Sequence, residues 1–172
     1  TINKSLTLTG SGSITGGVVI AASDVTVDGL SLSGGGESVI IVDGSAVRNN
    51  ITISDCVLDG DSDGKKAFHG KNSIAGDLTF DGNTIQNMSN WFVMDNTGST
   101  EDVLNALDNV VFSNNTIINV HGSIAFRGNV DNPIDNAIIN NNTANTYVVI
   151  NSFLIFSFIK NLVLNNTRII IK

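Results

Sequence analysis

The sequence predicts an all-β protein built as a stack of parallel strands, and a recurring phrase is the main reason. The phrase has three strand positions: an apolar residue, then usually Thr or Val, then a second apolar residue. Asp, Ser, Gly or Asn follow at a corner. Its copies begin at Leu6, Val25, Ile51, Leu78, Val110, Ala137 and Leu162. After the first short interval the copies stand 25–32 residues apart, a period typical of solenoids. The β-branched residues of the phrase suit strands, and Asn and Gly suit the corners.

Each repeat also holds a second strand after the corner and a third strand before the next phrase. We expect the third strands at residues 18–20, 39–42, 67–70, 91–94, 124–127 and 147–150. Three short strands and three corners per repeat predict a right-handed single-stranded parallel β-helix, a β-solenoid of about six to seven coils. The whole of residues 1–172 is then one domain, or a fragment of a longer coil. An insertion loop is expected at about 95–108, with a short helix over 100–107.

Corner asparagines recur at one position of the phrase. They are Asn83, Asn115 and Asn142, and the flanking copies carry Cys56 and Thr167 there. In a stack, equal positions of neighbouring coils lie about 4.8 Å apart. A side-chain amide both donates and accepts, so these residues are predicted to form a structural ladder, with Cys56 as a small buried filler.

Charge and hydropathy exclude some partners and suggest others. Nine Lys and Arg against 16 Asp and Glu give a net charge of -7, which argues against nucleic-acid binding. No apolar run is long enough to span a membrane. The apolar stretch 153–159 is expected to fold over the last coil as a lid, with an exposed oligomer contact as the alternative. Open sheet edges at the coil ends offer a route to self-association.

The runs 78–85 (LTFDGNTI) and 112–119 (FSNNTIIN) resemble the repeat of pectate-lyase-like parallel β-helix proteins. The stretch 77–167 is also similar to uncharacterised surface β-helix proteins of Bacteroidetes-type bacteria, which implies an extracellular, cell-surface or virion-surface location. The resemblance implies the fold and leaves the function open, because the superfamily includes lyases, hydrolases, adhesins and tailspikes. The hydrolase motifs are absent apart from His69-Gly70 and His121-Gly122. The single proline, Pro133, excludes the lyase motif Arg-x-Pro-x-x-Arg.

The third strands provide the candidate site. Aligning them predicts a core column of Ile41, Phe68, Val93, Phe126 and Val149, and an outward column of Val42, His69, Met94, Arg127 and Ile150. A strip of polar residues then shares one face: Asp43, His69, Lys71, Asp95, Arg127, Asn129 and Asn151. In a site for acidic sugars, Arg127 would bind a carboxylate and His69 or Lys71 would act as base. An ordinary solvated strip beside turns is the alternative.

Asp59, Asp61 and Asp63 alternate along the chain before Gly64, as in the first half of an EF-hand loop. The closing Glu of such a loop is missing, because Gly70 stands near its place. We expect a polar turn here. Ca²⁺ remains the one cofactor that the sequence leaves open.

Three functions fit these features. The first is a non-catalytic extracellular or surface module, such as an adhesin, that binds a polysaccharide, a cell-surface glycan or another surface. The second is a polysaccharide lyase or hydrolase that acts on an acidic polysaccharide. The third is a structural module of a fibre, tailspike or surface layer. The missing motifs favour a function without catalysis.

Overall fold

The computed structural model describes residues 1–61, 65–70, 74–88, 92–95, 107–120, 124–127, 133–146, 154–157 and 159–171. These residues contain 20 strands and no helix. The strands form three sheets, and every third strand along the chain belongs to the same sheet. All pairings between them are parallel. The prediction of an all-β protein with parallel strands is confirmed, and the strand order is compatible with a solenoid.

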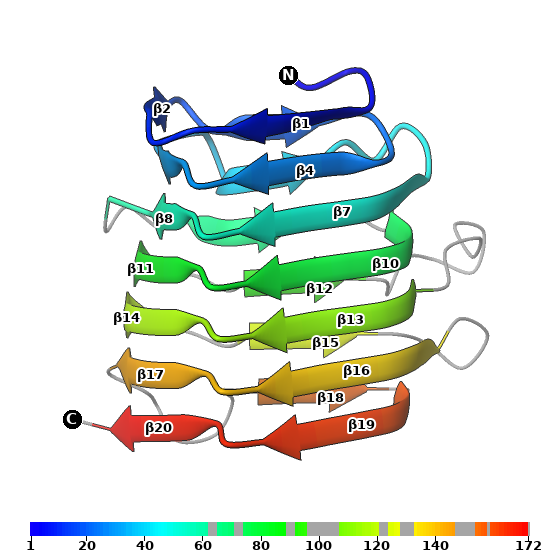
Figure 1. Ribbon diagram of the computed structural model, residues 1–172, viewed down its shortest axis with the longest axis vertical. Helices are drawn as coiled ribbons and strands as arrows, with labels where there is room; N and C mark the ends of the chain where they lie inside the picture. The colour runs from blue at the N-terminus through cyan, green and yellow to red at the C-terminus, as the bar shows by residue number, and fades with distance from the viewer. Residues whose placement is uncertain are drawn as a thin grey trace.

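We number the sheets by their first strand. The first sheet contains β1 (Leu6–Thr9), β4 (Val25–Asp28), β7 (Arg48–Ser54), β10 (Ile74–Asp81), β13 (Leu107–Ser113), β16 (Ile134–Asn140) and β19 (Ile159–Asn165). The second sheet contains β2 (Ser13–Thr15), β5 (Ser31–Ser33), β8 (Val57–Asp59), β11 (Thr84–Met88), β14 (Thr116–Val120), β17 (Thr143–Thr146) and β20 (Arg168–Ile171). The third sheet contains β3 (Val18–Ile20), β6 (Ser38–Val42), β9 (Lys66–His69), β12 (Phe92–Asp95), β15 (Ile124–Arg127) and β18 (Leu154–Ser157). Figure 1 shows the strands of each sheet lying one below another from the N-terminal end to the C-terminal end.

The recurring phrase forms the strands of the first sheet. Its two apolar positions point into the core, and its middle residue points outward, because successive side chains of a strand alternate. Val25 and Val27 are fully buried, whereas Thr26 between them is half-buried. The cross-strand partners of Val25 and Val27 in the next repeat are Ile51 and Ile53, which are also fully buried. Equal positions of successive repeats therefore stack into continuous apolar columns.

The corner after each phrase needs a left-handed backbone. The corner residues of the second to seventh repeats all have φ between 45° and 72°, and they are Gly29, Asp55, Gly82, Asn114, Asn141 and Asn166. Gly, Asn and Asp tolerate this conformation best. At Gly29 a side chain would also collide with the neighbouring repeat, since an added Cβ would lie 2.7 Å from the Gly10 carbonyl oxygen.

Buried asparagines bond the repeats together directly after this corner. Asn83, Asn115 and Asn142 are each 98–99% buried. The Asn115 Nδ2 donates to Asn142 Oδ1 at 3.0 Å and to the Phe80 carbonyl at 3.1 Å. The Asn115 Oδ1 accepts from the backbone N–H and from the Nδ2 of Asn83, both at 3.0 Å. Each amide thus replaces backbone hydrogen bonds that the turning chain cannot make for itself.

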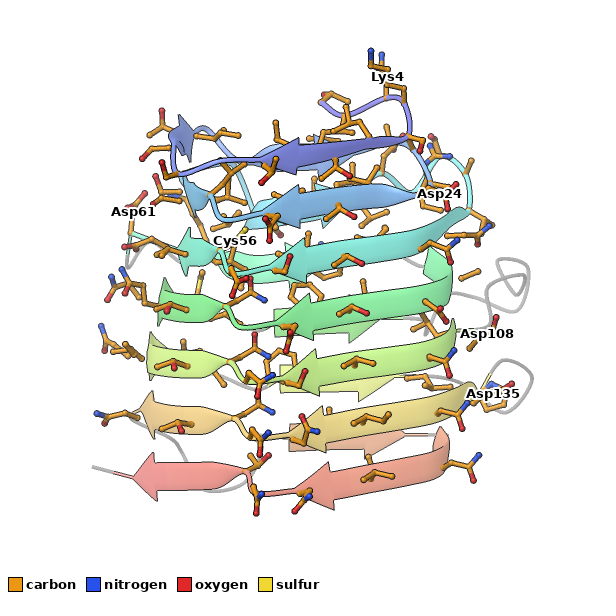
Figure 2. The ribbon with its side chains drawn as sticks, viewed as in Figure 1. Lys4, Asp24, Cys56, Asp61, Asp108 and Asp135 are labelled. Atoms are coloured by element: carbon orange, nitrogen blue, oxygen red, sulfur yellow. The ribbon has the colours of Figure 1, made fainter. Side chains whose placement is uncertain are left out.

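Cys56 occupies the same corner position one repeat earlier. Its side chain is 1% exposed, and its backbone N–H donates to Asn83 Oδ1 at 3.0 Å. Burial raises the pKa of the Cys56 thiol. Figure 2 places Cys56 at the corner between β7 and β8, in line with the corners below it. The thiol therefore serves as packing at the N-terminal end of the amide ladder.

Two sequence-based expectations for the third sheet are corrected. Ile41 was expected in the core and Val42 outside, but Val42 is fully buried and Ile41 is half-buried. The stretch 153–159 was expected to be a lid, but its residues Leu154–Ser157 form β18, which pairs with β15. The segment 147–150, expected as the last third strand, lies outside the described residues, as do residues 96–106 of the expected insertion.

Removal of one ladder amide should destabilise the fold strongly. Asn115→Ala leaves the buried Asn83 backbone N–H without the acceptor that Asn115 Oδ1 provides, at about 1–3 kcal/mol, and it also removes the bonds from Asn115 Nδ2 to Asn142 Oδ1 and to the Phe80 carbonyl. We expect the free energy of unfolding to fall by about 2–4 kcal/mol in urea denaturation.

The control is Asn136→Ala, which removes an amide that bonds Asn109 Oδ1 at 3.0 Å on the exposed surface. Water can replace that bond, so the loss should be below about 1 kcal/mol. Equal losses in the two variants would contradict a special role for the buried ladder.

Candidate functional site

The outer face of the third sheet is where the described residues of the predicted polar strip are found. One cross-strand column on this sheet runs through Val19, Ile41, His69, Val93, Ala125 and Ile155. The half-buried Ile41 and His69 show that this column faces outward, since Ile40 and Phe68 beside them are fully buried. His69 is the one polar residue of this column, and the other five residues are aliphatic.

A second outward column follows two residues later. Asp43 comes two residues after Ile41, and Asp95 comes two residues after Val93. Asp95 pairs in register with Arg127, which in turn pairs with Ser157. Alternation along the strands therefore places positions 43, 95 and 127 on the face that carries His69. With His69, four of the predicted site positions share one face of one sheet.

The prediction that Arg127 stands in the same outward column as His69 is wrong by two residues along the strand. The expectation was that His69 and Arg127 stand in one column, but His69 pairs with Val93, and Val93 pairs with Ala125. Arg127 lies one outward column further along, beside Asp95 on the neighbouring strand. Lys71, Asn129, Asn151 and His121 lie outside the described residues.

Around His69 the structure adds an acid that the sequence did not indicate. Glu37 directly precedes β6, and its carboxylate Oε2 is 3.9 Å from His69 Nδ1. The side chain of His69 is 16% exposed, and that of Glu37 is 68% exposed. The glycine run Gly34–Gly36 before Glu37 was the only local signal in the sequence. By itself, this run indicates a close approach of two backbone segments.

Asp43 is held by its own turn. Its carboxylate accepts from the Ser45 hydroxyl, from the Ser45 backbone N–H at 3.2 Å, and from Arg48 Nη2 at 3.5 Å. The hydrogen bonds from Ser45, with a smaller contribution from the positive charge of Arg48, lower the pKa of the Asp43 carboxyl. Asp43 therefore stays ionised and oriented at the edge of the outer face.

Polar residues on the other two sheets bond to their own neighbours in the stack. On the first sheet the Asp28 carboxylate accepts from Ser54 Oγ at 2.7 Å and from Thr9 Oγ1 at 3.1 Å. The same sheet carries an exposed column of bonds at 2.6–3.0 Å that joins Asp77, Asn109, Asn136 and Asn161. These groups link successive repeats, so much of their hydrogen-bonding capacity is already used.

The candidate calcium turn follows β8 on the second sheet. Burial raises the pKa of the Asp59 carboxyl, but hydrogen bonds outweigh this effect and lower the pKa overall. The donors are the Asp61 backbone N–H at 2.9 Å, Gln86 Nε2 at 2.6 Å and Asn87 Nδ2 at 3.1 Å. Asp61 Oδ2 lies 3.9 Å from Lys65 Nζ, and Asp63 lies outside the described residues. Figure 2 shows Asp61 beyond the end of β8, at the opposite edge of the stack from Asp24, Asp108 and Asp135.

Within the described ranges, no group of three or more His, Cys, Asp or Glu side chains is arranged to hold a metal ion. In the same part of the chain, no helix has the length and apolar character needed to cross a membrane. Comparison with protein-family models, curated proteins and solved structures finds no match for this chain. The function must therefore be argued from the columns and surfaces themselves.

The hydrogen bonds to Asp59 give a pH-dependent prediction. The Asp59 carboxyl should titrate below its ordinary value of 3.8 in a ¹³C NMR titration, and its pKa should rise in Gln86→Ala. Because the folded-state pKa is depressed, the stabilising effect is present above the unfolded pKa and is lost as pH falls through the folded pKa.

The matched control is Asn119→Ala, which removes an amide bonded to Asn87 and not to Asp59. It should leave the Asp59 titration nearly unchanged. An Asp59 carboxyl that titrates above 3.8 in the unmodified chain would refute these hydrogen bonds.

Proposed function

We propose that this chain is a right-handed parallel β-helix module, pectate-lyase-like in its repeat, which binds a polysaccharide or cell-surface glycan without catalysing a reaction. Successive strands of the chain belong to the three sheets in turn, and this order supports a helical winding of the chain. Right-handed crossovers are strongly preferred between parallel strands, which supports the hand. With seven strands in two of the sheets, the module has about six to seven coils.

The observation that carries the binding proposal is the contrast between columns. Where a column holds the stack together it repeats similar residues, as Asn83, Asn115 and Asn142 do. On the third sheet, one outer column instead sets His69 among aliphatic residues, and the next outer column places Asp95 beside Arg127 and Arg127 beside Ser157. Variation on a rigid, repetitive frame is what recognition of a specific partner requires, because binding residues sit on a scaffold that other residues hold.

A glycan is the partner whose chemistry suits this face. Carboxylates at positions 37, 43 and 95 can accept hydrogen bonds from sugar hydroxyls, and His69 can donate or accept. Arg127 is the natural group for a sugar carboxylate, since its planar guanidinium can donate two parallel bonds. A polysaccharide ligand in turn supports an extracellular or cell-surface location.

A polysaccharide lyase that acts on an acidic polymer is the rival function. His69 with an acid 3.9 Å from its Nδ1 is the observation that favours it, because a lyase needs a base beside the sugar carboxylate. Arg127, however, lies two strands and one column away from His69. The separation favours binding over proton abstraction.

The test is a glycan array with the purified chain, with and without Ca²⁺, followed by Arg127→Ala. We expect binding to at least one glycan with an acidic residue, and about tenfold weaker binding in Arg127→Ala, since a charge-assisted bond contributes about 1.5–3 kcal/mol. Lys4→Ala removes an equal charge at the exposed N-terminal end and should bind normally.

Two outcomes would contradict the proposal. If the chain bound no glycan on the array, a structural or assembly role would be favoured instead. An unsaturated product released from a uronate polymer, and lost in His69→Ala, would show that the chain is a lyase. Dependence of binding on Ca²⁺ would bring the turn of Asp59, Asp61 and Asp63 into the site.

A further inference from the structure

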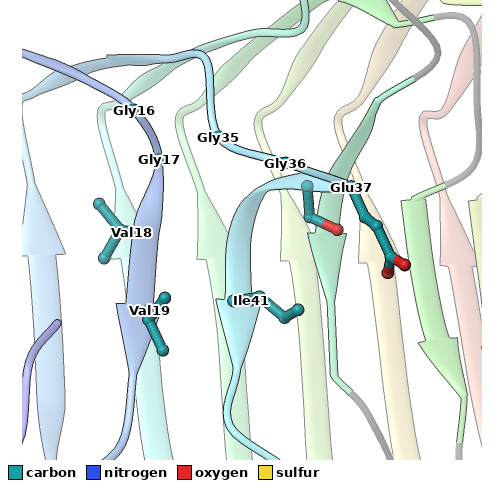
Figure 3. Close-up of a pocket in the computed structure, with 9 residues that line it drawn as sticks. Gly16, Gly17, Val18, Val19, Gly35, Gly36, Glu37 and Ile41 are labelled. Carbon is teal, nitrogen blue, oxygen red and sulfur yellow. The ribbon is translucent and has the colours of Figure 1, made fainter.

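A small hollow opens at the N-terminal end of the third sheet, on its outer side. It lies between the corners that lead into β3 and β6 and has a volume of about 190 Å³. Figure 3 shows that its walls come from two neighbouring repeats. Its lining residues are Gly16, Gly17, Val18, Val19, Gly35, Gly36, Glu37, Ser38 and Ile41.

Two of the glycines that line the hollow, Gly17 and Gly35, cannot carry side chains. Gly17 and Gly35 have φ of 77° and 82°, in the left-handed region that favours glycine. A Cβ on Gly17 would lie 2.9 Å from Gly35 Cα, and a Cβ on Gly35 would collide with the Ser38 carbonyl oxygen. The two repeats therefore approach each other through bare backbone, which leaves the space beside them open to a ligand.

Ser38 provides an independent sign of a missing partner. The residue is 5% exposed and lines the hollow. Among the described residues its Oγ has no hydrogen-bond partner. A buried hydroxyl without a partner costs free energy, so native structures normally satisfy it with protein, water or ligand.

The rest of the lining defines the chemistry of the ligand. Val19 and Ile41 supply an apolar surface, and the exposed Glu37 carboxylate supplies acceptors. The apolar side chains suit the C–H face of a sugar ring, while Glu37 and Ser38 suit its hydroxyls. Glu37 also repels an acidic sugar, because it is the only charged residue among those lining the hollow.

We propose that the hollow binds one neutral sugar residue, with Glu37 and Ser38 as its hydrogen-bonding partners. The volume of 190 Å³ equals about six water molecules of about 30 Å³ each and lies below the roughly 300–1,000 Å³ of larger ligand sites. The hollow therefore suits one sugar ring at a time. This inference rests on the proposed glycan binding and names a neutral residue as one part of the ligand.

The experiment is a two-dimensional NMR titration of the full chain with methyl glucoside, methyl mannoside, methyl galactoside and, as the acidic counterpart, methyl glucuronide. We expect a neutral glycoside to shift the backbone amide signals of Gly17, Gly35 and Ser38, with weaker binding of the glucuronide. Ser38→Ala and Glu37→Ala should each lower the affinity for the neutral glycoside about tenfold.

Ser38→Ala also separates a binding role from a structural one. If its hydroxyl serves a ligand, the variant without sugar should melt at the same or a higher temperature than the unmodified chain. The control for Glu37 is Asp108→Ala, an exposed acid on the first sheet, which should bind normally. Undiminished binding in Ser38→Ala, or a lower melting temperature in that variant, would overturn the proposal.

The outcomes also distinguish this proposal from the proposed function. If the monosaccharides shifted the amide signals but no glycan bound on the array, sugar binding in the hollow would be supported and recognition of a polymer would be rejected. Binding on the array that persists in Ser38→Ala, with no shift at Gly35, would reject the hollow alone. Shifts caused equally by methylammonium would show a cation site in its place.

Discussion

The constraint on which the structure depends is that each repeat lies directly on the one before it, in parallel and in register. A parallel neighbour at about 4.8 Å fixes which residue lies above which. Val25, Ile51, Leu78, Val110 and Ala137 form one buried column for this reason alone. A single repeat has no core of its own, so its apolar residues become buried only through their equivalents above and below.

The same constraint decides how the corners are stabilised. A tight corner with a left-handed residue leaves nearby backbone groups without strand partners. Because equal positions stack, an amide at one corner can bond the corner of the next repeat. Asn83, Asn115 and Asn142 do this inside the core. Asn109, Asn136 and Asn161 form a second ladder within the strands of the first sheet, on its exposed side. Because these ladders hold the frame, residues on the outer face of the third sheet, such as His69, are not needed for the ladders.

The sequence predicted most of the first sheet because the phrase alternates apolar and polar residues, and every copy shows the same alternation. The corner asparagines were visible for the same reason. The third strands were located well where flanking turns are clear, as at Ile124–Arg127. The register of these strands was not predicted correctly, because Ile41 and Val42 are both aliphatic. Only the structure shows that Val42 points inward.

Two further features could not be predicted from one sequence. The segments 147–150 and 154–157 are both apolar, so periodicity could not choose which one pairs with β15. The hollow beside Glu37 is lined by glycines from two repeats, Gly17 and Gly35, which meet across the stack. The glycine runs are visible in the sequence, but their contact depends on the register between repeats, which the sequence alone does not give.

The most direct measurement of the central claim is a double-mutant cycle between Asn83 and Asn115 in urea denaturation. If the ladder couples successive repeats, the two single Ala variants remove the same bond between them, and their losses will sum to more than the loss of the double variant. We predict a coupling of about 1 kcal/mol or more, as for directly bonded neighbours. Losses that add to within about 0.5 kcal/mol would mean that the two asparagines act independently, and would contradict the account.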